Sequence, residues 1–345
     1  MAKSDRLLTT LDDFDRFFVV MHDNPDPDAI ATGWGIRVLV REILNKPARV
    51  IGGGAIVRAE NRHMLDLLQP PIELVDDADV PDGTATILVD CGSESTNHLL
   101  IRKNILPVAV IDHHISNQRA LRLAFRDVRP NVAASATIAA SYLREQNVEP
   151  GAKLATAMVY ALRTETRGCE TRHSRLDRAI LTWLTERAEP ALLAEIETAP
   201  LSREYFGDLA LAIQNAFVYD DVALCFLPRA YGAEIVGEVA DLLIRCRGIR
   251  RVLCAAVVGT DLFFSARTET DSDNAAQLLR ATLNGLGGAG GHDHRAGGKI
   301  ADIANGSKIA EDLNDELRRR WLAACGVDRK RGTRLIPKRQ IVDNL

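Results

Sequence analysis

Short apolar runs alternate with longer segments of helical periodicity through the first half of the chain. The runs end at a polar residue or a glycine, which is typical of buried strands. Between them, apolar residues recur three and four positions apart, as in a helix with a buried face. Strands are predicted at Phe17–His22, Ala48–Ile51, Thr86–Val89 and Val108–Ile111, and helices at Ala29–Leu44, Asn61–Leu68, Ser135–Gln146 and Ala152–Leu162. Because strands that alternate with helices need crossover connections, we expect an α/β fold with a doubly wound parallel sheet.

The strand pattern then stops and resumes beyond residue 216. Pro190 and Pro200 punctuate the helical segments in between, which is typical of helix boundaries. Later strands are predicted at Val222–Leu227, Arg251–Val258 and Leu262–Ala266, and helices at Glu234–Arg245, Asn274–Leu283 and from about Lys308 to Ala324. The sequence therefore predicts an α/β domain over 1–190, a helical connector over 191–216, a smaller α/β domain over 217–325 and a basic, frayed tail over 326–345.

The composition is that of a globular protein and disfavours some kinds of partner. Of the 345 residues 46% are hydrophobic, and 43 basic against 47 acidic residues give a net charge of −4. Proteins that grip long duplex DNA usually carry a basic excess, so we do not expect that function. The sequence contains no apolar run of about 18 residues, no signal-peptide pattern and no CxxC pair. We therefore expect a cytoplasmic protein with reduced thiols and no membrane partner.

The end of the first predicted strand carries a concentration of ionisable side chains. The segment reads HDNPDPD, and its two prolines restrict the backbone around His22, Asp26 and Asp28. In a doubly wound sheet, ligands bind beyond the carboxyl ends of the strands. So many charged groups at one strand end repel each other unless a cation or water separates them. The pattern favours a divalent cation site, and the alternative is a solvated acidic turn.

Two further strand ends carry the same kind of residue. Asp90 follows one predicted strand, and Asp112, His113 and His114 follow another. The carboxyl ends of parallel strands lie at one edge of a sheet, so we expect these side chains to gather near His22. Carboxylate and imidazole without thiolate suit Mn²⁺ or Mg²⁺, and less often Zn²⁺ or Fe²⁺. The number of candidate ligands exceeds the need of one ion and predicts a two-metal site about 3.5–4 Å across.

These residues resemble the first three motifs of the DHH phosphoesterases. That superfamily includes RecJ-like exonucleases, nanoRNase-type oligonucleotidases, pAp phosphatases and cyclic-dinucleotide phosphodiesterases. The stretch Gly287–Gly298 is similar to the glycine-rich signature of the DHHA1 domain, and Ser265–Arg267 is similar to that domain's arginine-bearing strand. The alternative for the glycine stretch is a flexible linker. The resemblance implies a DHH metal-binding catalytic domain over 1–190 and a DHHA1 substrate-binding domain over 217–325.

The resemblance implies a role for each metal-binding position. His22 and Asp26 would bind one ion. Asp28 and His113 would bind the other, and Asp90 would bridge the two. The expected cofactor is a pair of Mn²⁺ ions, with Mg²⁺ or another divalent ion as the alternative.

Catalytic and substrate-binding roles also follow from the resemblance. His114 would face the scissile phosphate, and Asp112 would orient the histidine pair. In the second domain, Arg267 and His292 would hold the terminal nucleotide or phosphate. Glycines such as Gly290 and Gly291 allow backbone N–H groups to approach an anion closely. The expected active site lies in a cleft between the two domains.

The chain departs from the family at the fourth motif, where an aspartate is usual. The matching stretch, residues 161–168, reads ALRTETRG, so Glu165 occupies the position of that metal ligand. A glutamate can bind a metal, but its additional methylene shifts the carboxylate by about one bond length. This puts the affinity or the metal preference of the second site in question.

The expected activity is metal-dependent hydrolysis of phosphoester bonds in short nucleotides. Short RNA such as a dinucleotide, pAp, and linear or cyclic dinucleotides all remain open as substrates, and a processive DNA exonuclease fits less well. One alternative is a degenerate relative that binds nucleotides as a regulator, a reading that Glu165 favours. A relative of the family II pyrophosphatases is another. A homodimer is compatible with the sequence.

Other polar residues keep two interpretations. Ser135 and Thr137 fall where the family often has small hydroxyl residues near the site, or they belong to an ordinary helix face. Arg163 and Arg167 could contact phosphate or be solvated. The basic tail could follow a nucleic-acid strand or be solvated. Surface positions are expected for the remaining histidines, His63, His98, His173 and His294.

Overall fold

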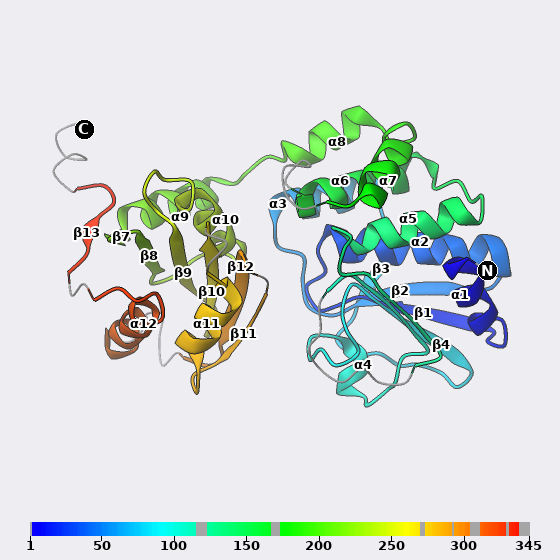
Figure 1. The fold of residues 1–345 in the computed structure, drawn as a ribbon, viewed down its shortest axis with the longest axis horizontal. Coiled ribbons are helices and arrows are strands. Elements are labelled where there is room, and N and C mark those ends of the chain that lie inside the picture. Colours follow the sequence, from blue (N-terminus) through cyan, green and yellow to red (C-terminus); the bar gives the residue numbers. More distant parts are fainter. Residues whose placement is uncertain are drawn as a thin grey trace. The chain divides into compact units, whose positions relative to one another are not determined.

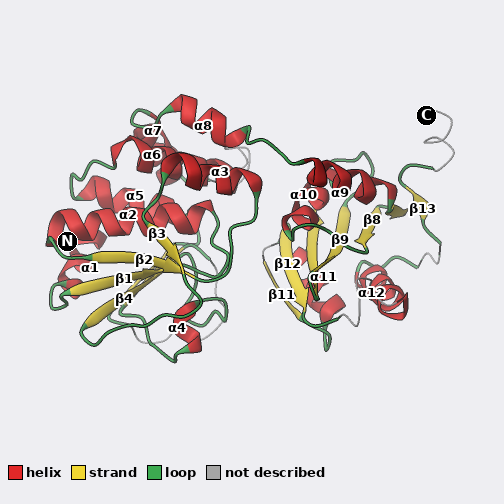
Figure 2. Ribbon diagram, turned by 180° about the vertical axis from the view of Figure 1, so that it is seen from behind, coloured by secondary structure: helices red, strands yellow, loops and turns green. Residues whose placement is uncertain are grey.

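The computed structural model describes residues 2–114, 123–166, 173–269, 273–291, 293–303, 311–328 and 331–337. The chain divides into two compact units, Met1–Pro200 and Leu201–Leu345, each with its own sheet (Figures 1 and 2). Helix α8 (Pro190–Glu197) belongs to the first unit, and α9 (Arg203–Gln214) belongs to the second. The boundaries expected at 190, 216 and 325 remain a prediction.

The first unit is a parallel sheet flanked by helices, as the sequence predicts (Figure 1). Its strand order is β3-β2-β1-β4-β5-β6, and all of its described strand pairs are parallel. The chain moves outward from β1 to β3 and then returns to β4 on the other side of β1. The carboxyl ends of β1 and β4 are therefore neighbours where the winding reverses, and doubly wound sheets bind ligands at such a point. The strands are β1 (Arg16–Val20), β2 (Ala48–Gly52), β3 (Ile72–Leu74), β4 (Thr84–Val89), β5 (Ala109–Asp112) and β6 (Phe125–Val128).

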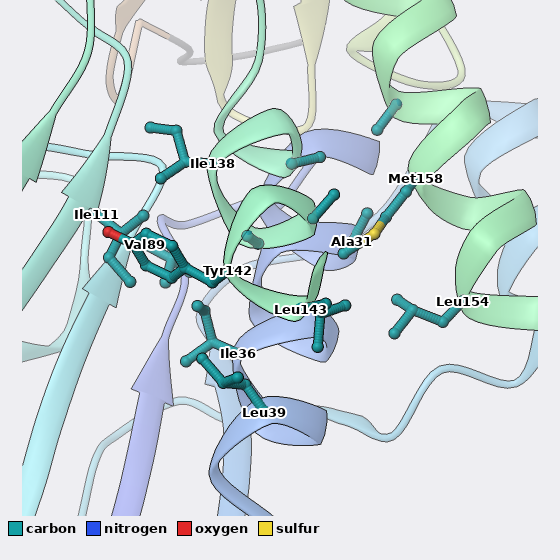
Figure 3. Close-up of a cluster of buried hydrophobic side chains, with 14 of the residues drawn as sticks. Ala31, Ile36, Leu39, Val89, Ile111, Ile138, Tyr142, Leu143, Leu154 and Met158 are labelled. Atoms are coloured by element: carbon teal, nitrogen blue, oxygen red, sulfur yellow. The ribbon is translucent and has the colours of Figure 1, made fainter. Parts of the chain in front are cut away.

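Eight helices of the described residues belong to the first unit. With α8, they are α1 (Lys3–Leu11), α2 (Pro27–Leu44), α3 (Ala59–Leu68), α4 (Leu99–Arg102), α5 (Ser135–Glu145), α6 (Gly151–Thr166) and α7 (Arg175–Thr185). Apolar side chains of α2, α5, α6 and the sheet form one core, in which Ile36 and Tyr142 are fully buried (Figure 3). A Cβ atom at Gly35 would lie 2.4 Å from Cε of Met158. Glycine therefore lets α2 approach α6 closely.

A buried carboxylate joins the far edge of the sheet to α5. Asp127 of β6 accepts hydrogen bonds from Arg129 at 2.6–3.1 Å and from the hydroxyl of Tyr142. Burial alone would raise the pKa of Asp127, but hydrogen bonds from Arg129 and Tyr142 outweigh it and lower the pKa below its ordinary value of 3.8. The ionised carboxylate therefore stabilises the folded protein above that pH, and this contribution is lost as the pH falls and the carboxylate becomes protonated.

We expect Asp127→Asn to lower the free energy of unfolding at pH 7 by about 1.5–3 kcal/mol, because hydrogen bonds to a charged group are lost. Urea unfolding from pH 7 down to about pH 3 would check the result, since the difference should shrink as the carboxylate of the natural protein becomes protonated. A difference that stays constant over this range would contradict the linkage.

The second unit is built on a mixed sheet with strand order β11-β12-β10-β9-β8-β7-β13. Only β8 and β9 pair in parallel among its described strands, and β9 and β10 form the predicted hairpin. The strands are β7 (Ala216–Tyr219), β8 (Val222–Leu227), β9 (Arg251–Val258), β10 (Asp261–Thr268), β11 (Gly288–Gly291), β12 (Arg295–Ile300) and β13 (Thr333–Arg334), and the helices besides α9 are α10 (Glu234–Leu243), α11 (Ala275–Leu283) and α12 (Glu311–Ala324). An α/β domain smaller than the first is thereby confirmed.

In this unit the structure excludes the alternative interpretation of the glycine stretch and corrects the expectation for the tail. The glycine-dense stretch is not a linker, because β11 and β12 pair along it in antiparallel register. Glycine is required there by close packing: a Cβ at Gly298 would lie 2.6 Å from Cδ1 of Leu283. The tail is not frayed throughout, since Thr333 and Arg334 pair with β7. None of the helices in the described part of the chain has the length and apolar character needed to cross a membrane.

Candidate metal centre

The carboxyl ends of β1 and β4 bring His22 and Asp90 together. The Nε2 atom of His22 lies 3.6 Å from Oδ2 of Asp90 and 3.9 Å from Oδ1 of Asp26. The other ring nitrogen, Nδ1, is 2.9 Å from the backbone carbonyl of Asp23 and donates to it in the tautomer that leaves Nε2 unprotonated. Nε2 of that tautomer presents a lone pair to the carboxylates, as a metal-binding histidine does.

Asp26 owes its position to the start of α2. Its Oδ1 atom accepts hydrogen bonds from the amides of Asp28 at 2.9 Å and Ala29 at 3.0 Å. Pro27 occupies the first helical position, where a missing N–H costs nothing. The PDPD segment is therefore a helix cap, and the cap fixes both Asp26 and Asp28 at the edge of the sheet.

A second group of ligand atoms forms beside the first and shares Asp90 with it. Nε2 of His113 lies 3.6 Å from Oδ1 of Asp90 and 3.7 Å from Oδ2 of Asp28. Nδ1 of His114 lies 3.8 Å from Oδ1 of Asp90. The two oxygens of Asp90 thus face different histidines. Its backbone has a left-handed φ of +58°, a conformation that aspartate tolerates better than most residues.

The N-terminus of α5 holds the two buried carboxylates in place. The amides of Ser135 and Ala136 donate to Asp28, each at 2.7 Å, and the hydroxyl of Ser135 donates to Asp90 at 2.8 Å. Asp28 and Asp90 are 1% and 3% exposed. The sequence left the role of Ser135 open, and it gave no sign of the Ala136 amide, because a backbone donor has no residue signature.

The electrostatics of this cluster fit a divalent cation. Burial, followed by repulsion from Asp90, Asp26 and Glu165, raises the pKa of Asp28 well above its ordinary value. Burial would also raise the pKa of Asp26, but the hydrogen bond and charge attraction with His22 outweigh burial and lower this pKa to about 2. In each of the groups His22–Asp26–Asp90 and Asp90–His113–His114, the donor atoms lie within 4.8 Å of one another. Nitrogen and carboxylate oxygen donors at such spacing suit a cation of the Mn²⁺ or Mg²⁺ type.

Asp112 orients the histidine pair without belonging to either group. Its Oδ1 atom accepts hydrogen bonds from the amide of His113 at 2.8 Å, the amide of His114 at 3.1 Å and Nδ1 of His114 at 2.7 Å. Burial lowers the pKa of His114, but Asp112 and Asp90 outweigh it and raise the pKa to about 9. The His114 ring, 37% exposed, is therefore a cation at neutral pH in the metal-free protein.

Glu165 and the predicted substrate residues lie outside the two groups. Glu165, at the end of α6, is close enough to Asp28 to influence its pKa, yet it belongs to neither group of donor atoms. Arg267, Gly290 and Gly291 lie on strands of the second unit. His292 lies outside the described residues.

The guanidinium of Arg267 is engaged within its own unit. It donates to Asp241 at 2.7 and 3.3 Å, to the hydroxyl of Ser265 at 2.6 Å and to the carbonyl of Ala266 at 2.9 Å. Only 8% of the residue is exposed.

One histidine expected at the surface is buried. His98 is 1% exposed, and its Nδ1 atom accepts a hydrogen bond from the amide of Ile101 at the start of α4. His98 also forms a β-bridge with His22, so it supports the loop that carries a candidate ligand. The sequence concealed this role because a long-range backbone pairing leaves no local pattern.

Comparison with known proteins agrees with this geometry. Residues 16–162 match the DHH family, N-terminal domain. An uncharacterized protein of Methanocaldococcus jannaschii is 31% identical over 315 residues, which are 90% of this chain and 64% of that protein. A probable manganese-dependent inorganic pyrophosphatase of Streptococcus suis is 26% identical over 193 residues, which are 56% of this chain and 58% of that protein. The chain thus spans less than two thirds of the length of these relatives.

Two solved structures share the fold. An exopolyphosphatase-related protein from Bacteroides fragilis superposes with a TM-score of 0.72 at 15% identity, over 94% of this chain and 97% of that one. RecJ from Thermus thermophilus in complex with Mn²⁺ gives a TM-score of 0.53 at 16% identity, over 94% of this chain and 54% of that one. The match of residues 16–162 to the DHH family, N-terminal domain, confirms the resemblance that the motifs predicted for the first unit, and the two solved structures share its fold.

Proposed function

We propose that this protein is a metal-dependent phosphoesterase that hydrolyses phosphoester bonds in short nucleotides, such as an oligoribonucleotide, pAp or a linear or cyclic dinucleotide. The observation that carries the proposal is Asp90, whose two carboxylate oxygens face the donor atoms of two neighbouring groups. A buried carboxylate placed between two histidine-containing groups is suited to bridging two cations. The Streptococcus suis relative is named as manganese-dependent, and the RecJ structure contains Mn²⁺, which supports the choice of metal.

The proposed ligands are His22, Asp26 and Asp90 for one ion, and Asp90, Asp28, His113 and Glu165 for the other. When bound, divalent ions supply Lewis acidity toward a phosphoryl oxygen and lower the pKa of a water. His114 would bind a substrate oxygen through the exposed side of its ring, while Asp112 holds its Nδ1 atom. Asp28 and Asp90 stay fixed because α5 supplies their hydrogen bonds.

We also propose that the second unit binds the substrate as a DHHA1 domain does. The proposed contacts are Arg267, His292 and the backbone of Gly290 and Gly291. Gly290 would admit a Cβ without obstruction, so space remains above this part of β11. An arginine can form two parallel hydrogen bonds with a phosphate, as Arg267 now does with Asp241.

Pyrophosphate hydrolysis is a second candidate, favoured by the similarity to the Streptococcus suis protein. Purified full-length protein, incubated with Mn²⁺ and separately with pyrophosphate, pAp, dinucleotides, cyclic dinucleotides and longer RNA, would distinguish the candidates. We expect release of nucleoside monophosphate from a short substrate. Turnover of pyrophosphate alone would favour the second candidate. Nucleotide binding without turnover of any substrate would indicate a regulatory relative.

The replacement Glu165→Asp is expected to tighten the second ion by several-fold, because the shorter side chain restores the family's ligand. We expect the natural protein to hold less than two equivalents of metal as purified and to gain activity when Mn²⁺ is added. Titration calorimetry of both proteins with Mn²⁺ would measure the effect. Glu197→Asp is a matched control, since Glu197 pairs with Arg163 rather than with a proposed ligand. Two equally tight sites in the natural protein would refute the prediction.

A further inference from the structure

Asp177 is a buried carboxylate that is not among the proposed ligands. It lies in the first turn of α7 and is 2% exposed. Within its own helix it forms a capping box with Ser174, whose amide and hydroxyl donate to Oδ2 at 2.6 and 2.7 Å. This local role accounts for one oxygen of the carboxylate.

The remaining contacts of Asp177 reach a different helix. The amide of Ala133 donates to both oxygens at 3.1 Å, and the hydroxyl of Thr137 donates to Oδ1 at 2.6 Å. Ala133 and Thr137 lie on either side of the residues that hold Asp28 and Asp90. Asp177 therefore fastens the start of α5 at two points, one before its first turn and one within it.

The start of α5 has no side-chain cap of its own. Its N-cap residue, Ala134, supplies no side-chain hydrogen bond, and the first free amides of the helix, those of Ser135 and Ala136, donate to Asp28 instead. The position of Asp28 and the position of this turn thus depend on each other. A fixed turn orients Asp28, whereas a loose turn lets both move.

We propose that Asp177 is a positioning residue for the metal centre: by holding Ala133 and Thr137, it fixes the turn that aims Asp28 and Asp90 at the cations. The proposal rests on the proposed function, since it assumes that Asp28 and Asp90 bind metal. Groups that orient metal ligands typically change metal affinity by about 10–100-fold when they are removed.

The test compares two buried carboxylates that contact the same helix at different turns. Asp177 contacts α5 at Thr137, and Asp127 contacts it at Tyr142, five residues or about 7.5 Å further along the axis. Asp177→Asn keeps the shape of the side chain but replaces one acceptor by a donor. Asp127→Asn makes the same change away from the turn that holds Asp28. Thr137→Val removes one contact of Asp177 with little change in volume, and Thr137→Ser retains the hydroxyl.

Metal-free, full-length proteins are titrated with Mn²⁺ by calorimetry, and their unfolding is measured in urea. We expect Asp177→Asn to weaken Mn²⁺ binding by about tenfold or more, and Thr137→Val to weaken it by a few-fold. Thr137→Ser should bind as the natural protein does. Asp127→Asn should lower stability with an unchanged dissociation constant for Mn²⁺.

Three outcomes would overturn the proposal. They are normal Mn²⁺ affinity in both Asp177→Asn and Thr137→Val, an equal loss of affinity in Asp127→Asn, and absence of Mn²⁺ binding in the natural protein. If Asp177→Asn fails to fold, the comparison of Thr137→Val with Thr137→Ser decides the result. If the natural protein binds Mn²⁺ but hydrolyses no substrate, the proposed function fails, and the calorimetric comparison still tests the role of Asp177.

Discussion

Replacing Asp90 by alanine is expected to reduce turnover by about a thousandfold or more, the largest effect of any single change that we consider. Among the described residues, Asp90 is the one whose oxygens face donor atoms of both groups, so its loss removes a ligand from two proposed ions at once. It also leaves the hydroxyl of Ser135 without its acceptor. Calorimetry should show both Mn²⁺ sites weakened in the same variant.

The rates of Asp90→Ala and of the natural protein would be compared at saturating Mn²⁺ and a short nucleotide. Asp127→Asn is the control for the loss of a buried carboxylate, because its contacts are with Arg129 and Tyr142 and not with a candidate ligand. We expect that control to remain active. Activity near that of the natural protein in a folded Asp90→Ala variant would refute the two-metal mechanism.

Replacing Arg267 by alanine is expected to raise KM for a short nucleotide by about 10–100-fold, with a smaller effect on kcat. A hydrogen bond to a charged group contributes about 1.5–3 kcal/mol, and Arg267, which lies in the second unit, would bind the substrate without being a proposed metal ligand. The replacement Asp241→Asn leaves the guanidinium of Arg267 in place but weakens its hydrogen bond to residue 241, because the acceptor is no longer charged. This variant should bind the nucleotide as well as or better than the natural protein does.

Steady-state kinetics with a dinucleotide and with a long single-stranded RNA would test the second unit's proposed role. Arg319→Ala serves as the matched control, since Arg319 lies on α12 and pairs with Glu316 at the surface. An unchanged KM in Arg267→Ala would remove Arg267 from the proposed substrate site. Faster degradation of the long strand than of the dinucleotide would contradict the preference for short substrates.

Most candidate ligands could be found from the sequence because they follow a short apolar run. His22, Asp90 and His113 come just after strand ends, and a parallel sheet places such ends at one edge whatever the details of packing. The same periodicity predicted the central strands and the long helices. It did not predict β3, whose three residues are partly exposed, or β11, whose sequence GAGG has no apolar pattern.

The sequence by itself determined the fold class of the first unit and most of the residues that gather at its candidate metal centre, because hydrophobic period and strand-end position are local properties. The tertiary structure decided what surrounds them. It showed that the amides of Ser135 and Ala136 hold Asp28, that Arg267 is bonded to Asp241, and that Asp177 fastens α5. These contacts join residues 26 to 108 positions apart or depend on backbone groups, which every residue type shares. A local pattern carries no record of such pairings, so only the folded chain reveals them.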